Sequence, residues 1–274
     1  MADLQKTHIP EETAELFRRL SLEAHKDKEL YTCPVCRDNG WFITEQGATP
    51  CKCKNASRSI NRRRAAGLKP AMDDMVLADF DLRYYSVERQ IKPGCSYRQT
   101  AEKALRAARI FVTACLKGEC ERGLYYEGNL GSGKTFLAAA ITGELLNKGL
   151  AARFIVVPEF LEQLRHSYRS LDDGDYDEKE LMNGVMSAPV LVLDDLGAHN
   201  SSSWTIGKIY TLLNNRLNNK LPCIITSNLK PAALAEELGP RAASRIKEMC
   251  DRYILLTDED IRTSRERAGY GWQN

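Results

Sequence analysis

No stretch of about 18 consecutive apolar residues occurs in the sequence, so we expect no membrane-spanning helix. The N-terminal residues MADLQKTHIPEET contain no apolar core of the kind that a secretion signal requires. There is also no internal repeat and no low-complexity tract, which argues against repeat architectures. We therefore predict an ordinary globular protein of the cytoplasm, without a membrane partner.

The charges are almost balanced, with 39 Lys and Arg against 37 Asp and Glu and a formal net charge of +2. With so small an excess, binding to nucleic acid would depend on local basic patches and not on an overall field. The chain has 274 residues, of which 43% are hydrophobic. That is enough for one large domain or two unequal domains with a real core.

The composition changes near residue 70. Residues 11–27 carry apolar side chains at helical spacing, residues 31–54 are rich in turn formers and contain four cysteines, and residues 54–69 are basic. Beyond this point, short apolar segments alternate with longer helical ones. We therefore predict a small N-terminal domain over residues 1–70, with a basic linker at its end, and a second domain over residues 71–274.

Five short apolar segments in the second region predict the strands of a buried parallel sheet. The stretches between them are long enough for crossover helices, among them helices over residues 97–116 and up to residue 146. The predicted fold is an α/β protein with a five-stranded parallel sheet flanked by helices. The expected strands cover residues 124–126, 153–157, 190–193, 223–226 and 253–256.

The segment GNLGSGKT, residues 128–135, matches the phosphate-binding P-loop and lies between an apolar strand and an Ala-rich helix. Its glycines allow consecutive backbone N–H groups to surround an anion at a helix N-terminus. Lys134 is expected to reach the β- and γ-phosphates, and the Thr135 hydroxyl to ligate Mg²⁺. The alternative is a glycine-rich turn that caps a helix. The residues expected at ATP are Gly128, Asn129, Leu130, Gly131, Ser132, Gly133, Lys134, Thr135 and Phe136.

Polar groups also follow two later apolar segments. VLVLDDLG, residues 190–197, ends in Asp194, an expected Mg²⁺ ligand, and Asp195, which could orient or deprotonate the attacking water. Asn228 follows another strand and could bind the γ-phosphate or that water. The alternatives are a strand exit with a helix N-cap for the two aspartates and a turn former for Asn228.

Arg241 and Arg245 stand four residues apart on an expected helix, so they project from one face. An arginine offered to the γ-phosphate of a neighbouring subunit stabilises transition-state charge. The alternative is a solvated pair or an ion pair within the chain.

The motifs GNLGSGKT, VLVLDDLG, ITSN and RAASRI, in this order, resemble the AAA+ ATPases of the bacterial helicase-loader group, DnaC and DnaI, and their relative IstB. The resemblance covers residues 75–262. It implies Walker A residues Lys134 and Thr135, Walker B residues Asp194 and Asp195, sensor 1 at Asn228, and an arginine finger at Arg245 beside Arg241. After the last strand too few residues remain for a C-terminal lid, as in the loader group. The roles of Arg262, Arg265 and Arg267 stay open.

Four of the nine cysteines are clustered as Cys33-Pro-Val-Cys36 and Cys51-Lys-Cys53. Four thiolates in two close pairs predict a tetrahedral structural Zn²⁺ site, closed to substrate. The Asn39-Gly40 turn and the apolar residues 41–43 favour a zinc-ribbon hairpin. The alternative is a disulfide pair or free thiols, which a reducing compartment disfavours. The cluster resembles the zinc-bearing part of DnaI-type loaders, which engages the replicative helicase.

A helix expected from Pro158 carries Arg165, Tyr168 and Arg169, a pattern that could grip phosphates and stack a base of single-stranded DNA. Proteins like DnaC and DnaA contact DNA at this point of the fold, and a solvated helix face is the alternative. The Arg62 to Arg64 run could contact DNA or the helicase, or be a solvated linker.

Four functions compete. The first is an oligomeric, DNA-stimulated ATPase that loads a hexameric DnaB-type helicase onto single-stranded DNA during replication initiation or restart, with ATP hydrolysed at subunit boundaries. The second is an IstB-like transposition helper that binds DNA and a transposase. A small-molecule P-loop kinase and a zinc-dependent adaptor whose ATP site only gates binding are the others. The implied cofactors are ATP, Mg²⁺ and Zn²⁺.

Overall fold

The computed structural model describes residues 33, 35–36, 41–44, 47–169, 174–198 and 202–267. The chain forms two compact units, residues 1–62 and 63–274, and each is described here by itself. Residues 63–70, which the composition assigned to the N-terminal domain, belong to the larger unit. The helix expected over residues 11–27 and the Asn39-Gly40 turn lie outside the described residues.

The larger unit is built around the predicted five-stranded sheet, in the order β6-β7-β8-β5-β9. Every neighbouring pair in it is parallel. The sheet is therefore confirmed. The strands are β5 (Gly123–Gly128), β6 (Ala152–Val156), β7 (Val190–Asp194), β8 (Cys223–Ser227) and β9 (Cys250–Leu255).

The last strand begins three residues earlier than the sequence pattern suggested. Cys250 is buried and pairs with Gly123, but Asp251 and Arg252 are exposed on this edge strand. Because a sheet edge can expose side chains that a central strand must bury, the apolar pattern underestimates the length of β9.

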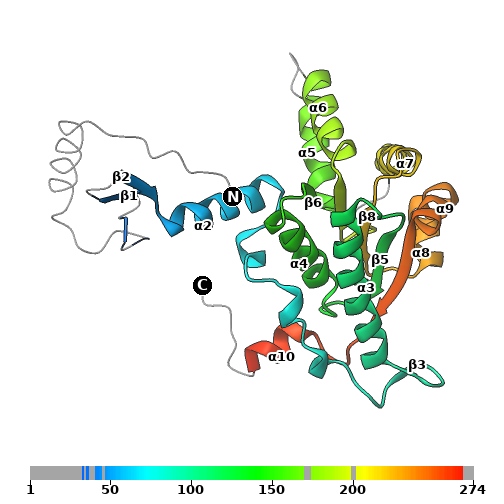
Figure 1. The fold of residues 1–274 in the computed structure, drawn as a ribbon. Coiled ribbons are helices and arrows are strands. Elements are labelled where there is room, and N and C mark those ends of the chain that lie inside the picture. Colours follow the sequence, from blue (N-terminus) through cyan, green and yellow to red (C-terminus); the bar gives the residue numbers. More distant parts are fainter. Residues whose placement is uncertain are drawn as a thin grey trace. The chain divides into compact units, whose positions relative to one another are not determined.

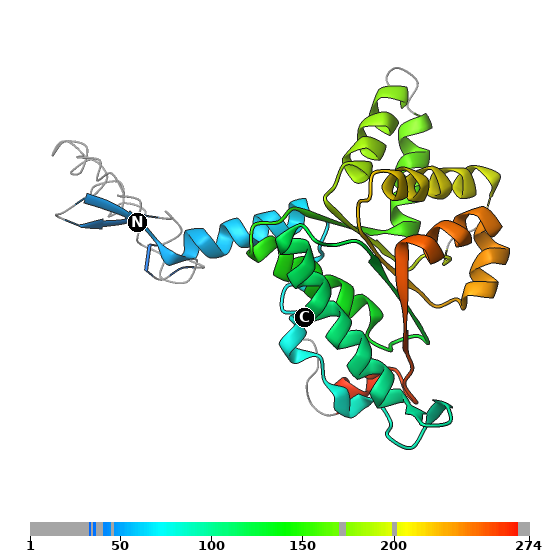
Figure 2. The ribbon, with the colours of Figure 1, turned by 45° about the vertical axis from the view of Figure 1, so that its right-hand side comes forward.

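Two hydrophobic clusters cover the two faces of the sheet, as the alternation of strand side chains requires. Tyr126 and Val192 belong to the cluster under α3 and α4, whereas their neighbours Tyr125 and Leu193 belong to the cluster under the later helices. Figures 1 and 2 show the helices on both faces. They are α3 (Tyr97–Lys117), α4 (Lys134–Asn147), α5 (Val157–Arg169), α6 (Gly174–Met186), α7 (Ser203–Asn218), α8 (Pro231–Leu238) and α9 (Pro240–Met249).

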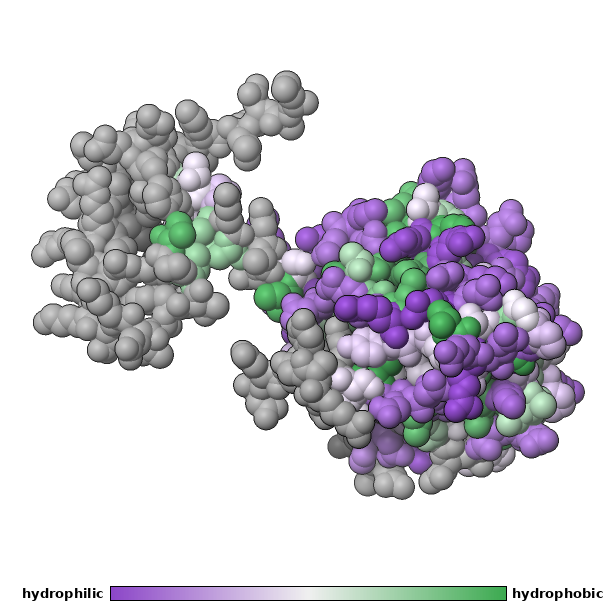
Figure 3. All heavy atoms as spheres, turned by 90° about the horizontal axis from the view of Figure 1, so that it is seen from below, coloured by the Kyte–Doolittle hydropathy of each residue, from purple (hydrophilic) through white to green (hydrophobic). Residues whose placement is uncertain are grey.

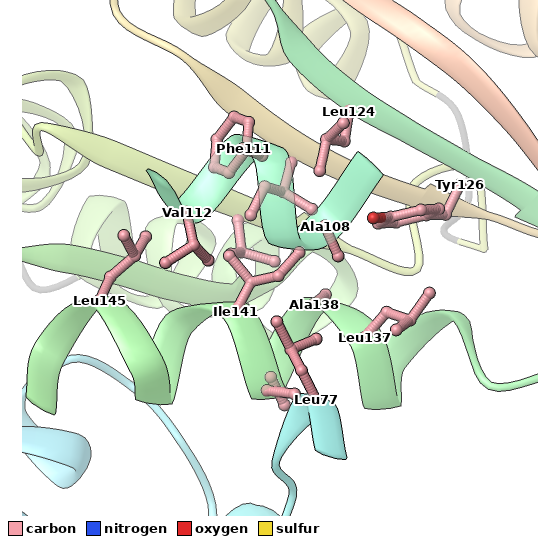
Figure 4. Close-up of a cluster of buried hydrophobic side chains, with 14 of the residues drawn as sticks. Leu77, Ala108, Phe111, Val112, Leu124, Tyr126, Leu137, Ala138, Ile141 and Leu145 are labelled. Carbon is pink, nitrogen blue, oxygen red and sulfur yellow. The ribbon is translucent and has the colours of Figure 1, made fainter. Parts of the chain in front are cut away.

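The first cluster fixes the helix that follows the P-loop. Val112 of α3 points toward Ile141 and Leu145 of α4, and Phe111 of α3 lies on the side of Leu124 of β5 (Figure 4). All five side chains are at most 4% exposed. Packing of this kind holds the N-terminus of α4 at the end of β5, where the phosphate-binding loop lies.

Short elements of the larger unit precede and follow this core. Three 3-10 turns, η1 (Pro70–Met72), η2 (Leu77–Asp79) and η3 (Leu82–Tyr84), precede a hairpin of β3 (Gln90–Lys92) and β4 (Cys95–Ser96). Ser96 then starts α3 with a capping box to Gln99. Beyond β9, the described residues end with α10 (Ile261–Arg267).

The smaller unit contains an antiparallel hairpin of β1 (Trp41–Thr44) and β2 (Gly47–Pro50), in which Trp41 pairs with Pro50 and Thr44 with Gly47. The strand expected over residues 41–43 is therefore present. The helix α2 (Lys52–Ala65) follows at once, with its last residues in the larger unit.

Hydrophilic side chains cover most of the coloured surface of the larger unit in Figure 3, with small separate apolar patches between them. Within the described ranges, no helix combines the length and the apolar character needed to cross a bilayer.

Arg216 is a fully buried cation of α7, with 0% of its surface exposed. Its guanidinium donates to the carbonyl oxygens of Ala188 and Pro222, both at 2.8 Å, and its Nε to Cys223 Sγ at 3.0 Å. It thereby ties the entry to β7 and the entry to β8 to one helix.

We expect Arg216→Met to destabilise the protein by about 3 kcal/mol, because it leaves several buried carbonyl groups without a donor. Urea unfolding followed by circular dichroism measures the change. Arg106→Met, at an exposed position of α3, is the matched control. Equal stability of the two variants would show that the buried hydrogen bonds contribute little.

Candidate nucleotide site

The phosphate-binding loop joins the end of β5 to the start of α4. Gly131 and Gly133 adopt positive φ angles of 64° and 86°, which L-residues with side chains rarely adopt. A Cβ on Gly128 would collide with the carbonyl of Leu255 in β9. The three glycines of the motif are therefore required by backbone conformation and close packing, and α4 begins at Lys134 directly behind them.

Two other segments hold this loop. On one side the hydroxyl of Tyr85, which is fully buried, donates to the Ser132 carbonyl at 2.7 Å. On the other side, Asn129 exchanges two hydrogen bonds with Thr257, at 2.8 and 3.1 Å. The N–H of Ile261 donates to Gly131 O at 3.1 Å. The sequence motif indicated neither support, because both come from outside it.

A small pocket adjoins the loop. The rings of Phe80 and Phe136 lie 6.0 Å apart there, and those of Phe80 and Tyr85 5.5 Å apart. Burial raises the pKa of Tyr85, which keeps its hydroxyl as a donor. Phe136, predicted from the sequence to contact ATP, thus lies beside the loop. The pocket is lined by Asp79, Phe80, Asp81, Tyr84, Tyr85, Gly133, Phe136 and Ile261.

Lys134 is buried, with 7% of its surface exposed. Its Nζ donates to Gly128 O at 3.0 Å and Asn129 O at 2.7 Å. Burial lowers the pKa of Lys134 to about 8, against the opposing charges of Asp195 and Asp194. A polyanion in the loop would favour the protonated form, so the position suits a phosphate-binding lysine.

Thr135 and Asp194 come together across the gap between α4 and β7. The Thr135 hydroxyl donates to Asp194 Oδ1 at 3.0 Å. Burial raises the pKa of Asp194, while hydrogen bonds from Thr226 and Thr135 lower it. One hydroxyl and one carboxylate at the N-terminus of a helix provide the oxygen ligands that Mg²⁺ prefers beside phosphates. The side chains present therefore fit a magnesium nucleotide.

Asp195 and Asn228 also meet at this edge of the sheet. Asn228 Nδ2 donates to Asp195 Oδ1 at 3.0 Å. Asp195 has a φ angle of 57°, one of two positive values among non-glycine residues in the described part of the chain. The residues predicted as Walker A, Walker B and sensor 1 thus lie within one group of side chains. Their catalytic roles remain predictions.

The predicted arginine finger does not lie in that group. Arg245 of α9 pairs with Glu248 at 3.2 Å, and Arg241 is exposed. Over the described ranges, no hydrogen bond or ion pair connects either arginine to the P-loop. The ion-pair alternative therefore describes Arg245 within one chain, and a role in a neighbouring subunit's site stays a prediction.

The predicted DNA contacts are only partly described. Arg165 of α5 pairs with Glu162 at 2.9 Å, and its guanidinium lies 5.6 Å from the ring centre of Trp204 in α7. The side chains of Tyr168 and Arg169 lie outside the described residues. Arg63 and Arg64 both pair with Asp73.

The smaller unit brings its four cysteines together. The Sγ atoms of Cys33, Cys36, Cys51 and Cys53 all lie within 4.8 Å of one another. Backbone N–H groups of Cys36 and Val35 lower the pKa of the Cys33 thiol to about 7. A tetrahedral zinc ion with Zn–S bonds of about 2.3 Å needs thiolates about this close. The cluster therefore fits a structural metal ion.

A P-loop at the carboxyl ends of a parallel sheet, with carboxylates on the adjacent strand, defines a P-loop nucleotide-binding protein. Residues 113–254 match the family model of the IstB-like ATP binding protein. The chain belongs to this family, which includes the AAA+ helicase loaders, and the resemblance inferred from the four motifs is confirmed.

Two curated relatives are replicative helicase loaders. DnaI of Bacillus subtilis (strain 168) is 40% identical over 141 residues, which span 49% of this chain and 44% of DnaI. DnaC of Escherichia coli (strain K12) is 27% identical over 138 residues, or 50% of this chain and 55% of DnaC. The chain thus matches about half the length of these relatives.

A crystal structure of DnaI superposes with a TM-score of 0.56 and 28% identity, over 69% of this chain and 95% of that structure. The fold of the larger unit is therefore a DnaI/DnaC-like fold.

Proposed function

We propose that this protein is an ATPase that loads a hexameric DnaB-type replicative helicase onto single-stranded DNA. The observation that carries the proposal is the 40% identity to a replicative helicase loader over 141 residues. The cysteine cluster of the smaller unit supports it. The site would work in the cytoplasm, where replication occurs.

ATP hydrolysis would use the residues that meet at the end of the sheet. When bound, magnesium ATP supplies the phosphoanhydride bond that is broken. Lys134 would hold the phosphate oxygens, and Thr135 and Asp194 would hold the metal. Asp195, with Asn228 bonded to its carboxylate at 3.0 Å, would orient a water molecule or accept its proton.

Arg245 would complete the site of a neighbouring subunit in an oligomer. It stands on a partly exposed helix face, its side chain 35% exposed, and its partner Glu248 is 57% exposed. An exposed ion pair of this kind stabilises by at most about 1 kcal/mol, so little free energy opposes a change of partner. Nucleotide binding at subunit boundaries would then control assembly.

The contacts with the helicase and with single-stranded DNA are inferred from the types of side chain available. The smaller unit, with zinc at Cys33, Cys36, Cys51 and Cys53, would bind the helicase. Arg165, Tyr168 and Arg169 would contact single-stranded DNA, with Trp204 holding Arg165 in place by a cation–π contact at 5.6 Å.

The test uses the full chain, a DnaB-type helicase from the same source and closed circular single-stranded DNA. Because the helicase ring cannot thread onto a closed circle by itself, we expect unwinding of an annealed strand only when this protein and ATP are present. The P-loop variant Lys134→Ala serves as the control. If the chain neither binds the helicase nor permits unwinding, the loader function is wrong, and duplex DNA binding with a transposase would favour the transposition helper.

A further inference from the structure

The end of β8 carries a threonine that the sequence motifs do not assign. Thr226 is 1% exposed and follows the apolar residues Ile224 and Ile225 in the same strand. A hydroxyl at a buried strand position costs free energy unless it is hydrogen-bonded, and valine would fill the same volume. The presence of threonine at this position therefore indicates that its hydroxyl has hydrogen-bond partners.

The hydroxyl of Thr226 connects the two acidic residues of the candidate site. It donates to Asp194 Oδ1 at 2.7 Å and accepts from the backbone N–H of Asp195 at 2.9 Å. An N–H can only donate, so the proton of the hydroxyl is left for the carboxylate. Both bonding directions of this one hydroxyl are thereby satisfied inside the site.

The two residues after Thr226 also form hydrogen bonds to the segment that contains the two aspartates. Ser227 Oγ donates to Leu196 O at 2.6 Å, and Asn228 Nδ2 donates to Asp195 Oδ1 at 3.0 Å. Leu196 N donates back to Thr226 O at 2.9 Å. The segment 226–228 is thus bonded residue by residue to the segment 194–196.

Asp195 needs this support because its φ angle is 57°. A left-handed conformation costs an ordinary L-residue about 1–2 kcal/mol, less for aspartate, so it persists only where its surroundings hold it. The bond from its N–H to Thr226 fixes the backbone, and the bond from Asn228 fixes the carboxylate. The Asp195 side chain is directed by the end of β8.

We propose that Thr226 is a positioning residue that sets the orientation of Asp194 and Asp195 for ATP hydrolysis. The inference rests on the proposed ATPase function. Within the described part of the chain, Thr226 forms no hydrogen bond to Lys134 or Thr135. It acts only through the Asp194 carboxylate and the Asp195 backbone N–H. Groups of this kind typically change metal affinity or activity by about 10- to 100-fold when removed.

The test compares Thr226→Val, which keeps the shape and removes the hydroxyl, with Thr226→Ser, which keeps the hydroxyl. For Thr226→Val we expect kcat to fall about 10- to 100-fold, with a smaller change in KM for ATP and a higher Mg²⁺ concentration for half-maximal rate. Thr226→Ser should restore most of the rate. Thr142→Val, which removes another fully buried hydroxyl on α4, is the control and should leave kcat unchanged.

A readout without nucleotide separates this inference from the ATPase proposal. Hydrogen exchange at the Asp195 amide should accelerate in Thr226→Val and not in Thr142→Val, since only the first removes its acceptor. A wild-type protein that hydrolyses no ATP would refute the ATPase, and the exchange data would still test the hydroxyl. Unchanged exchange, or a Thr226→Ser variant as slow as Thr226→Val, would overturn the role of Thr226.

Discussion

Replacement of Lys134 by alanine is expected to lower the rate of ATP hydrolysis by about 100- to 1000-fold, the range seen when one preorganised donor to a developing charge is removed. Lys134 is buried at the start of α4, and its Nζ already lies against two carbonyl groups of the loop that would surround the phosphates. Its ammonium group is the cation that this loop offers to the β- and γ-phosphates.

Steady-state hydrolysis and ATP titration measure the effect. Lys148→Ala is the matched control, because Lys148 follows the same helix but lies on the surface, 3.3 Å from Glu144. The fold should be unchanged in both variants, which circular dichroism checks. Hydrolysis by Lys134→Ala at the wild-type rate would contradict the assignment of the P-loop.

The same variant tests whether Arg245 acts across a subunit boundary. Arg245→Ala should also lose hydrolysis, because the transition-state charge loses a cation. A mixture of the two variants should recover part of the rate, since an intact P-loop then meets an intact Arg245 at some boundaries. If mixing restores nothing while the variants still assemble with each other, Arg245 is not the finger.

Much of the larger unit's fold was predictable because its strands are buried on both faces. A central strand such as β7 reads as a continuous apolar run, and all five of its residues are indeed buried. Strand boundaries were predicted less well where the position in the sheet, and not the apolar sequence pattern, decides which residues form the strand. The edge strand β9 exposes Asp251 and Arg252, and the pattern therefore placed its start too late.

In the candidate site, too, local features could be predicted from the sequence, whereas contacts between distant segments could not. The position of the P-loop, the two aspartates and Asn228 at one edge of the sheet was predictable, because each is a local motif at the end of a strand. The hydrogen bonds of Tyr85 to the loop and of Thr226 to the two aspartates were not predicted. Their partners, Ser132 and Asp194, are distant in sequence, so no local pattern identifies the partner of either hydroxyl. A buried hydroxyl inside a strand end is the one indication that could have directed attention to Thr226.

Removal of the metal is expected to have the second large effect, confined to the smaller unit. The hairpin of β1 and β2 has four residues in each strand, too few to form a stable core by itself. Binding of Zn²⁺ to four thiolates contributes about 10–16 kcal/mol in small zinc domains, and this free energy is then the free energy of folding. We therefore expect one zinc per chain and loss of the hairpin when it is removed.

Elemental analysis of protein purified without chelators measures the zinc, and hydrogen exchange over residues 41–50 measures the hairpin. Cys36→Ser with Cys51→Ser should abolish zinc binding and the association with helicase, because both thiolates are predicted ligands and both residues are buried. Cys120→Ser, at a partly exposed cysteine outside the cluster, should retain both. ATP binding should survive in each variant, since the P-loop and its supports lie in the larger unit. Less than one zinc per chain in the wild-type protein would contradict the metal assignment, and helicase binding by the zinc-free variant would place the partner site elsewhere.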